Sequence, residues 1–140
     1  MATYTPHWYG NGLLNVFKGN IDMDGHTFKM ILVTGYTPNI DSHNGYSDVS
    51  AQEESGTGYT ATGVTLSNKA VTKDTTNDRA KFDADDVTWT GLNVGTPSHS
   101  ILYDDTHASD CLVAYWEVTT PTNGGNYTLQ FGANGIILLT

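Results

Sequence analysis

The sequence predicts an all-β fold, a single antiparallel β-sandwich or jelly-roll-like domain, from three observations. Glycine is abundant, with 15 residues among 140, and threonine, asparagine and aspartate are frequent. This mixture favours turns and pleated strands over helices. Short apolar or alternating runs recur between turn signals, as is typical of a two-sheet β fold. The length suits one domain, which we place at residues 13–140 behind an N-terminal arm of residues 1–12.

The N-terminal arm contains a proline, a Gly-Asn-Gly turn and three aromatic side chains, Tyr4, Trp8 and Tyr9. Because tyrosine and tryptophan are enriched at protein interfaces, we expect this arm to dock on another surface. The apolar run that follows the arm, residues 13–18, is predicted to be the first strand.

Residues 28–34 form the strongest strand candidate of the chain. Phe28, Met30 and Leu32 share one face, and the opposite face, which includes Ile31, is apolar too. A strand that is apolar on both sides lies in the centre of a sheet or beneath an interface. We therefore place this strand in the interior.

The segment 35–58 carries turn signals instead of a strand pattern, and we expect one short helical turn, or two, within residues 47–54. Ser50 and Glu53 have the spacing of a capping box, and Ser47 is the alternative cap. Two adjacent acids at the carboxyl end would oppose the helix dipole, so the helical piece should be short.

The later strands follow from alternation and from the turn residues between them. Ala80, Phe82 and Ala84 alternate with charged residues, as in a half-buried strand. Asn134-Gly135 favours a type I′ turn, so the last two strands should form a hairpin. The predicted strands are residues 59–66 paired with 69–74, then 79–85, 87–90 after a bulge, 100–103, 111–118, 127–131 and 136–139.

The net charge of −9 comes from 15 acids against six bases. This excess argues against nucleic-acid and anionic-membrane partners, because both are bound through lysine and arginine. The N-terminal residues lack the charged and apolar regions of an export signal, and no apolar run approaches the roughly 18 residues of a membrane span. We expect a soluble protein that is made in the cytoplasm.

The acidic residues offer one weak metal hypothesis. Asp83, Asp85 and Asp86 crowd one strand end, and Asp104 and Asp105 follow another, so their oxygens could bind Ca²⁺ if the ends met. Aspartates that initiate turns at strand ends explain the same pattern. We therefore expect no metal site.

No catalytic motif is present, and we expect neither enzymatic activity nor a cofactor. The five histidines are scattered without the local pairs typical of zinc sites. Cys111 lies in an apolar run and is predicted to be a buried thiol, and Trp89 and Trp116 are predicted to lie in the core. The remaining aromatic residues in loops and in the arm are the interface candidates: Tyr4, Trp8, Tyr9, Tyr46 and Tyr59.

Several phrases of the chain, taken in order, resemble those of small virion structural proteins of tailed bacteriophages. They are residues 28–32, 36–43, 47–53, 56–60, 83–89, 101–106, 129–131 and 135–139. The resemblance covers roughly residues 13–140, and the chain departs from it in the aromatic arm and in the polar stretch 108–110.

This resemblance implies a capsid decoration (cement) protein, a homo-oligomer, commonly a trimer, on the outer capsid surface of the virion. Its partner would be the major capsid protein, and the arm and the 35–58 loop would contact either that protein or a neighbouring subunit. The alternative is a receptor- or glycan-binding module of a head or tail fibre, which would use loop aromatics and Ca²⁺ at Asp83, Asp85 and Asp86. A hydrolase would need a triad or a metal site that the sequence does not offer.

Overall fold

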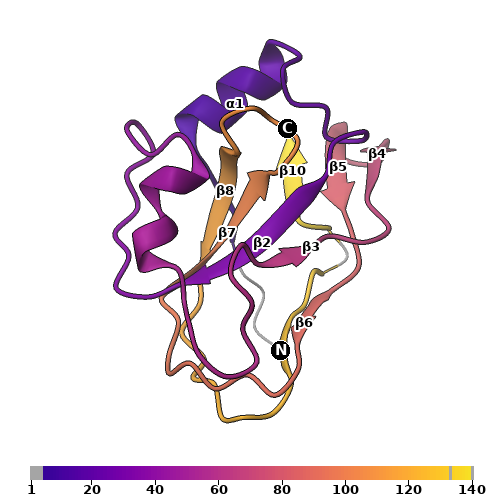
Figure 1. The fold of residues 1–140 in the computed structure, drawn as a ribbon. Coiled ribbons are helices and arrows are strands. Elements are labelled where there is room, and N and C mark those ends of the chain that lie inside the picture. Colours follow the sequence, from indigo (N-terminus) through magenta and orange to yellow (C-terminus); the bar gives the residue numbers. More distant parts are fainter. Residues whose placement is uncertain (1–4, 133, 140) are drawn as a thin grey trace.

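The computed structural model describes residues 5–132 and 134–139, and this part of the chain is mostly β, with antiparallel sheets and one short α-helix (Figure 1). The elements before residue 60 are β1 (His7–Trp8), α1 (Gly10–Phe17), β2 (Phe28–Val33) and the 3₁₀ turns η1 (Tyr46–Asp48) and η2 (Ser50–Gln52). The later strands are β3 (Val64–Thr65), β4 (Ala70–Asp74), β5 (Arg79–Asp83), β6 (Val87–Trp89), β7 (His99–Asp104), β8 (Cys111–Glu117), β9 (Tyr127–Leu129) and β10 (Ile137–Leu139).

The main sheet has five antiparallel strands in the order β1-β8-β7-β2-β3. Strand β2 lies between β7 and β3, and both of its faces are buried. Met30 belongs to one hydrophobic core and Ile31 to the other. The prediction of an interior strand at this position is confirmed.

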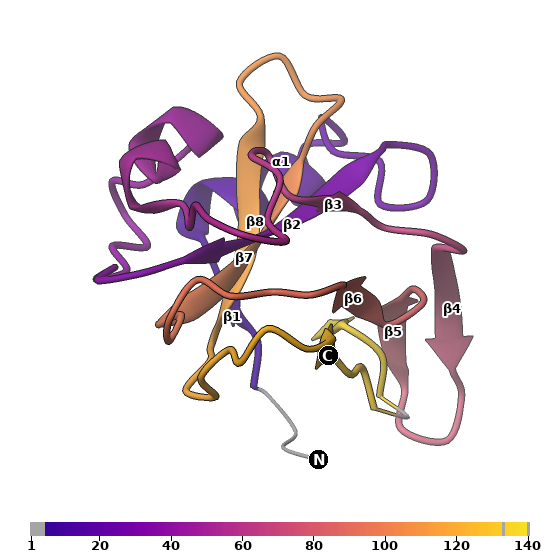
Figure 2. The ribbon, with the colours of Figure 1, turned by 60° about the horizontal axis from the view of Figure 1, so that its bottom comes forward.

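The two cores lie on opposite faces of the main sheet. The first core also contains side chains of a three-stranded sheet, β10-β5-β4, and of a two-stranded sheet, β6-β9. Figure 2 shows β4, β5 and β6 to one side of the main sheet. The rings of Phe28 and Phe82, whose centroids are 5.5 Å apart, join the main sheet to the three-stranded one. Trp89 and Trp116 are buried in this core, as predicted. The antiparallel β class is thus confirmed, whereas the finer sandwich or jelly-roll description stays a prediction.

The second core is covered by the 35–58 segment. Tyr36 and Val49 from this segment pack with Ile101, Tyr103 and Leu112 of the main sheet. The predicted short helical piece is present as the turns η1 and η2. The cap differs from the predicted one, since the Asp48 carboxylate accepts the amides of residues 44 and 45 at the start of η1.

The predicted strand at residues 13–18 is wrong, because residues 13–17 belong to α1 and Lys18 is its C-cap. Gly12 is buried against β8, where an added Cβ atom would lie 2.3 Å from the Leu112 carbonyl oxygen. Val16 packs beside it against the first core, while Leu14 and Phe17 face outward. Among the described helices, none is long and apolar enough to cross a membrane.

The described part of the arm is built into the domain. Strand β1 pairs with β8, so that Trp8 lies opposite Ala114. Tyr9 is fully buried, its amide donates to the Val113 carbonyl at 3.0 Å, and its hydroxyl lies 2.7 Å from that of Tyr36. The surface on which the arm docks is therefore the main sheet of its own chain.

Two predicted strand pairings are also wrong. Strand β3 pairs with β2, and β4 pairs with β5, so residues 59–66 and 69–74 do not form a hairpin. Gly135 does occupy a turn with a φ of 72°, but β10 pairs with β5 and not with β9. Ile137 lies opposite Phe82, and both Ile136 and Ile137 are buried in the first core.

Candidate functional site

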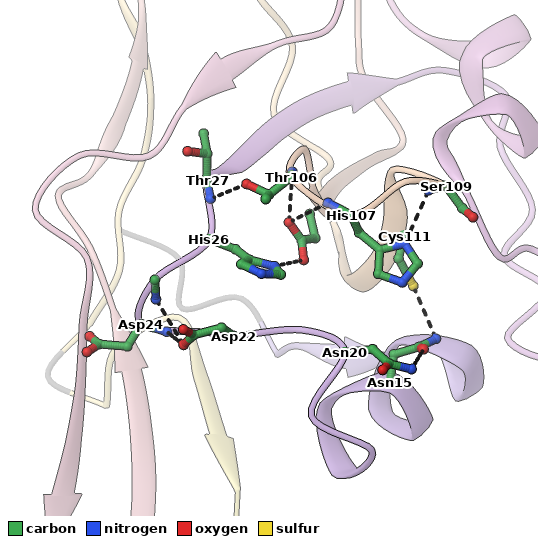
Figure 3. A network of polar contacts seen from close by, with 12 residues as sticks. Asn15, Asn20, Asp22, Asp24, His26, Thr27, Thr106, His107, Ser109 and Cys111 are labelled. Carbon is green, nitrogen blue, oxygen red and sulfur yellow. Dashed lines mark hydrogen bonds and ion pairs between the residues drawn. The ribbon is translucent and has the colours of Figure 1, made fainter.

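Asp104, at the end of β7, is a fully buried carboxylate with three partners (Figure 3). Its Oδ2 lies 2.6 Å from the His26 Nδ1, and its Oδ1 accepts the amides of Thr106 and His107 at 2.9 and 3.2 Å. Burial of a carboxylate is costly unless it is paired and hydrogen-bonded, and both conditions are met here. The arrangement joins the loop before β2 to the turn between β7 and β8.

Cys111 lies opposite Asp104 in the β7–β8 ladder and is fully buried. Its Sγ lies 3.6 Å from the side-chain Nδ2 of Asn11 and 3.8 Å from the Nδ2 of Asn15, so the thiol points toward α1 (Figure 3). Burial, followed by the nearby Asp104 charge, raises the pKa of the thiol. Since the thiolate is the reactive form, this environment favours packing over nucleophilic chemistry.

Glu53 holds together a second polar cluster, at the edge of the second core. Its two oxygens accept the hydroxyls of Tyr46 and Tyr59, the latter at 2.8 Å. The Tyr59 hydroxyl in turn accepts the Leu32 amide at 3.1 Å. Burial and the contact with Glu53 raise the pKa of Tyr46 to about 12, and burial also raises that of Tyr59. Both phenols therefore remain neutral donors.

A third cluster runs from the second core to the surface. The Asn39 amide donates to the Nδ1 of His43 at 3.3 Å, so this nitrogen is an acceptor. Tyr36 then donates its hydroxyl to the same nitrogen at 2.7 Å, and Tyr9 donates to Tyr36 at 2.7 Å. Burial raises the pKa of both phenols. This relay ties residues 36–43 to the arm.

The same aromatic row continues along the main sheet. Tyr36 meets His99 edge-on at 5.5 Å, and His99 meets Tyr115 at 5.8 Å. Tyr115 stacks on His7 with ring centroids 5.0 Å apart. This row thus contains three of the five histidines, although they are scattered in the sequence. They are His7, His99 and, at the end of the relay, His43. Sequence spacing gave no signal of this convergence.

The crowded aspartates do not form a Ca²⁺ site. The Asp83 carboxylate accepts the next amide of the chain, that of Asp85 accepts the Asn68 side chain at 2.6 Å, and that of Asp86 accepts the Phe131 amide at 2.8 Å. Within the residues that the structure describes, no three acidic, histidine or cysteine side chains could hold a metal ion together.

The other acidic motifs have structural partners as well. Asp105 pairs with Lys29 at 3.6 Å and lies after β7, whereas Asp104 is held by His26. The Asp22 carboxylate accepts the backbone amides of Asp24 and Gly25, as is typical of a turn.

The predicted interface aromatics occupy very different environments. Tyr9 is in the interior and is not accessible to a partner. Tyr46 and Tyr59 are half-buried and serve the Glu53 cluster. Trp8 is half-buried and packs against the first core, and Tyr4 lies outside the described residues.

The exposed apolar side chains are different residues, and sequence reasoning missed them. Phe17 and Leu14, on the outer face of α1, are 72% and 48% exposed. Ile40 and Val71 are exposed too. The pair on α1 was hidden by the prediction of a strand there, since residues three apart share a face only in a helix.

An apolar groove lies between the three-stranded sheet and the N-terminal elements. Its volume is about 130 Å³. The side chains around it include Trp8, Val16, Met23, Val71, Phe82 and Ile137.

Two buried polar atoms in the described region have no hydrogen-bond partner, the Glu54 Oε1 and the Trp89 Nε1. Glu54 is only 6% exposed, and burial raises the pKa of its carboxyl group. Buried polar groups are normally satisfied, so these two atoms are a local cost to the fold.

No protein-family model, no curated protein and no solved structure matched this chain.

Proposed function

We propose that the chain is a structural protein of a tailed-phage virion, a capsid decoration (cement) protein that binds the major capsid protein on the outer surface of the particle. The sequence phrases of residues 28–139 support this proposal. The observation that carries it is the outer face of α1, where Leu14 and Phe17 are exposed side by side on a rigid element. Such an apolar pair is suited to a partner surface.

In the proposed role, many copies of the protein would each contribute a small interface with the shell. A small docking face gives a modest interface in each copy, and a homotrimer would multiply that interface at each lattice position. The buried clusters around Asp104 and Glu53 fasten loops to the sheets, which keeps the docking face preorganised.

The arm cannot be tested by simple deletion. Removing residues 1–12 would remove β1, the buried Tyr9 and the first turn of α1, and we expect it to unfold the domain. Lost particle binding after that deletion would therefore say nothing about the arm.

The decisive test combines imaging with surface substitutions. Cryo-electron microscopy of purified virions should place the 15.1 kDa domain in many symmetric copies on the outer shell. The exchange Leu14→Ser with Phe17→Ser should reduce the number of copies per particle while the purified protein stays folded, because both side chains are exposed. Thr65→Ala, at an exposed position of β3, is the control and should leave occupancy unchanged.

Three outcomes decide the matter. Density only at a fibre or tail tip would overturn the decoration role. Symmetric copies on the shell that persist in the α1 double variant would keep the role but move the docking face. Loss in the double variant alone supports both.

A glycan-binding module of a head or tail fibre is the second candidate, and the stacked His7–Tyr115 pair at the edge of the main sheet favours it. Aromatic rings of this kind stack on sugar faces, and Glu117 follows Tyr115 on the same face of β8. A glycan array would test it, with Tyr115→Ala as the probe variant. Saturable binding that this variant loses would favour the module over the decoration protein.

A further inference from the structure

The outer edge of β4 is open in the described part of the chain. Strand β4 ends the three-stranded sheet β10-β5-β4, and Figure 2 shows it standing at the margin of the molecule. All five of its residues pair with β5 on the other side. An open strand edge presents unpaired amides and carbonyls that can accept a further strand.

The groove described above lies directly beside this edge. Val71 of β4, Phe82 of β5 and Ile137 of β10 lie opposite one another across the strands, so their side chains share one face, and all three line the groove. Val71 is 43% exposed and forms the rim. The volume of about 130 Å³ suits one large apolar side chain, since an apolar cavity of about 150 Å³ holds benzene.

The charge around β4 is opposite to that of the rest of the chain. Residues 69–83 contain four of the six bases and three of the 15 acids. Asp74 is already paired with Arg79 at 2.9 Å. Lys73 lies two residues after Val71, so it projects to the same face of β4, and it is exposed. The edge therefore favours a negatively charged partner, although the whole chain carries a charge of −9.

We propose that the β4 edge binds an extended acidic peptide segment as an additional strand. A large apolar side chain of that segment, placed opposite Val71, enters the groove, and an acidic side chain two residues away faces Lys73. Side chains opposite one another in adjacent strands project to the same face, which fixes this spacing. A second copy of β4 is a poorer occupant, because it would bring the lysines of two copies together.

The test uses a fluorescein-labelled peptide, Gly-Thr-Glu-Thr-Leu-Thr-Glu-Thr-Gly, with the full-length protein. Its glutamates flank the leucine at two residues on either side, so either strand direction meets Lys73. We expect saturable binding by fluorescence anisotropy at about 0.15 M salt, where the net charge of the protein is screened beyond about 8 Å. Replacing both glutamates by lysine, or the leucine by serine, should each weaken binding by about tenfold or more.

Two substitutions to glutamate, on different strands, provide the test and its control. Lys73→Glu reverses the charge at an exposed position on the Val71 face of β4 and should weaken binding about tenfold or more, because like charges would face one another. Thr65→Glu places the same acidic side chain at an exposed position of β3, an edge strand of the main sheet, and should leave binding unchanged. Circular dichroism of both variants establishes that they are folded.

Absence of saturable binding, or equal binding by the Lys73→Glu and Thr65→Glu variants, would overturn the proposal. Equal binding of the leucine and serine peptides would show that the groove takes no side chain, and would overturn it as well. These results do not bear on the decoration role, which is tested through α1 and not through β4.

Discussion

At the scale of single residues, polar side chains of this protein connect separate chain segments through hydrogen bonds. Glu53 is the clearest case, because it takes up the hydroxyls of Tyr46 and Tyr59 where the 35–58 segment meets β2. Tyr59 has a second task, since its oxygen is the acceptor for the Leu32 amide. The two tyrosines thus carry the same hydroxyl group, but only the Tyr59 hydroxyl both donates to Glu53 and accepts the Leu32 amide.

We therefore expect Tyr59→Phe to cost more stability than Tyr46→Phe. The first exchange leaves the Leu32 amide without an acceptor and removes one of the two hydroxyl donors to Glu53, at about 1–3 kcal/mol. The second removes only one donor to Glu53 and should cost about 0.5–1.5 kcal/mol. Urea unfolding of the two variants measures this difference, and equal free energies of unfolding would contradict the assigned network.

Glu54 predicts a pH dependence of stability. Burial raises its folded-state pKa above the ordinary glutamate value, so its contribution is favourable below that value and is lost as the pH rises through the folded-state pKa. Glu54→Gln should therefore stabilise the protein at pH 7, and the advantage should shrink as the pH approaches 4. Thermal unfolding of both proteins across this range gives the measurement. A pH-independent difference would mean that the carboxyl group does not change protonation on folding.

At the scale of elements, the contact of α1 with β8 depends on the absence of a side chain at Gly12. Intrinsic propensity favours alanine over glycine by about 1 kcal/mol inside a helix. An added Cβ atom, however, would lie 2.3 Å from the Leu112 carbonyl oxygen and 2.9 Å from the Val113 Cα. Both of these are backbone atoms of a central strand, which cannot move aside cheaply.

We expect the steric clash of the added Cβ atom to outweigh the gain in helix propensity. Gly12→Ala should destabilise the protein by about 1–3 kcal/mol, the usual cost of overpacking. Gly10→Ala in the same helix is the matched control, because its Cβ would lie 3.1 Å from the Ile40 carbonyl oxygen and needs a smaller adjustment. Chemical denaturation of both variants checks the prediction, and a stabilised Gly12→Ala protein would refute the close packing.

The elements also show how far local patterns reach. Strand β2 was predictable, because an apolar run on both faces is a property of six neighbouring residues. The partners of β3 and β10 were not, since pairing is decided by contacts such as Ile137 with Phe82, which are far apart in sequence. The helix α1 was missed because its Gly-Asn-Gly start is typical of a turn, whereas packing on β8 stabilises it as a helix.

The same limit applies to the candidate sites. The burial of Cys111 could be inferred from its apolar neighbours. The interior position of Tyr9 could not, because its partner Tyr36 is 27 residues away. The exposure of Phe17 could not be inferred either, because it depends on which face of α1 packs against β8.

At the scale of the whole molecule, the second core is unusually rich in phenols. Burial raises the pKa of four tyrosines that belong to this core or pack against it: Tyr9, Tyr36, Tyr46 and Tyr103. Ionising any of them in the folded state would place a charge where it is poorly solvated. The second core thus couples folding to alkaline pH.

The direction of the pH dependence of stability follows from the direction of these pKa shifts. A raised folded-state pKa gives stability that is complete below the ordinary tyrosine value of about 10 and is lost as the pH rises above it. For Tyr46 this loss extends to about pH 12. Because the four phenols share one core, we expect their effects to combine into a single cooperative unfolding transition above pH 10. Phenolate absorbance and circular dichroism, followed together, should change in the same narrow pH range. A smooth phenolate titration with a midpoint near 10, complete before the dichroism changes, would mean that these hydroxyls reach water in the folded protein and that the second core is open.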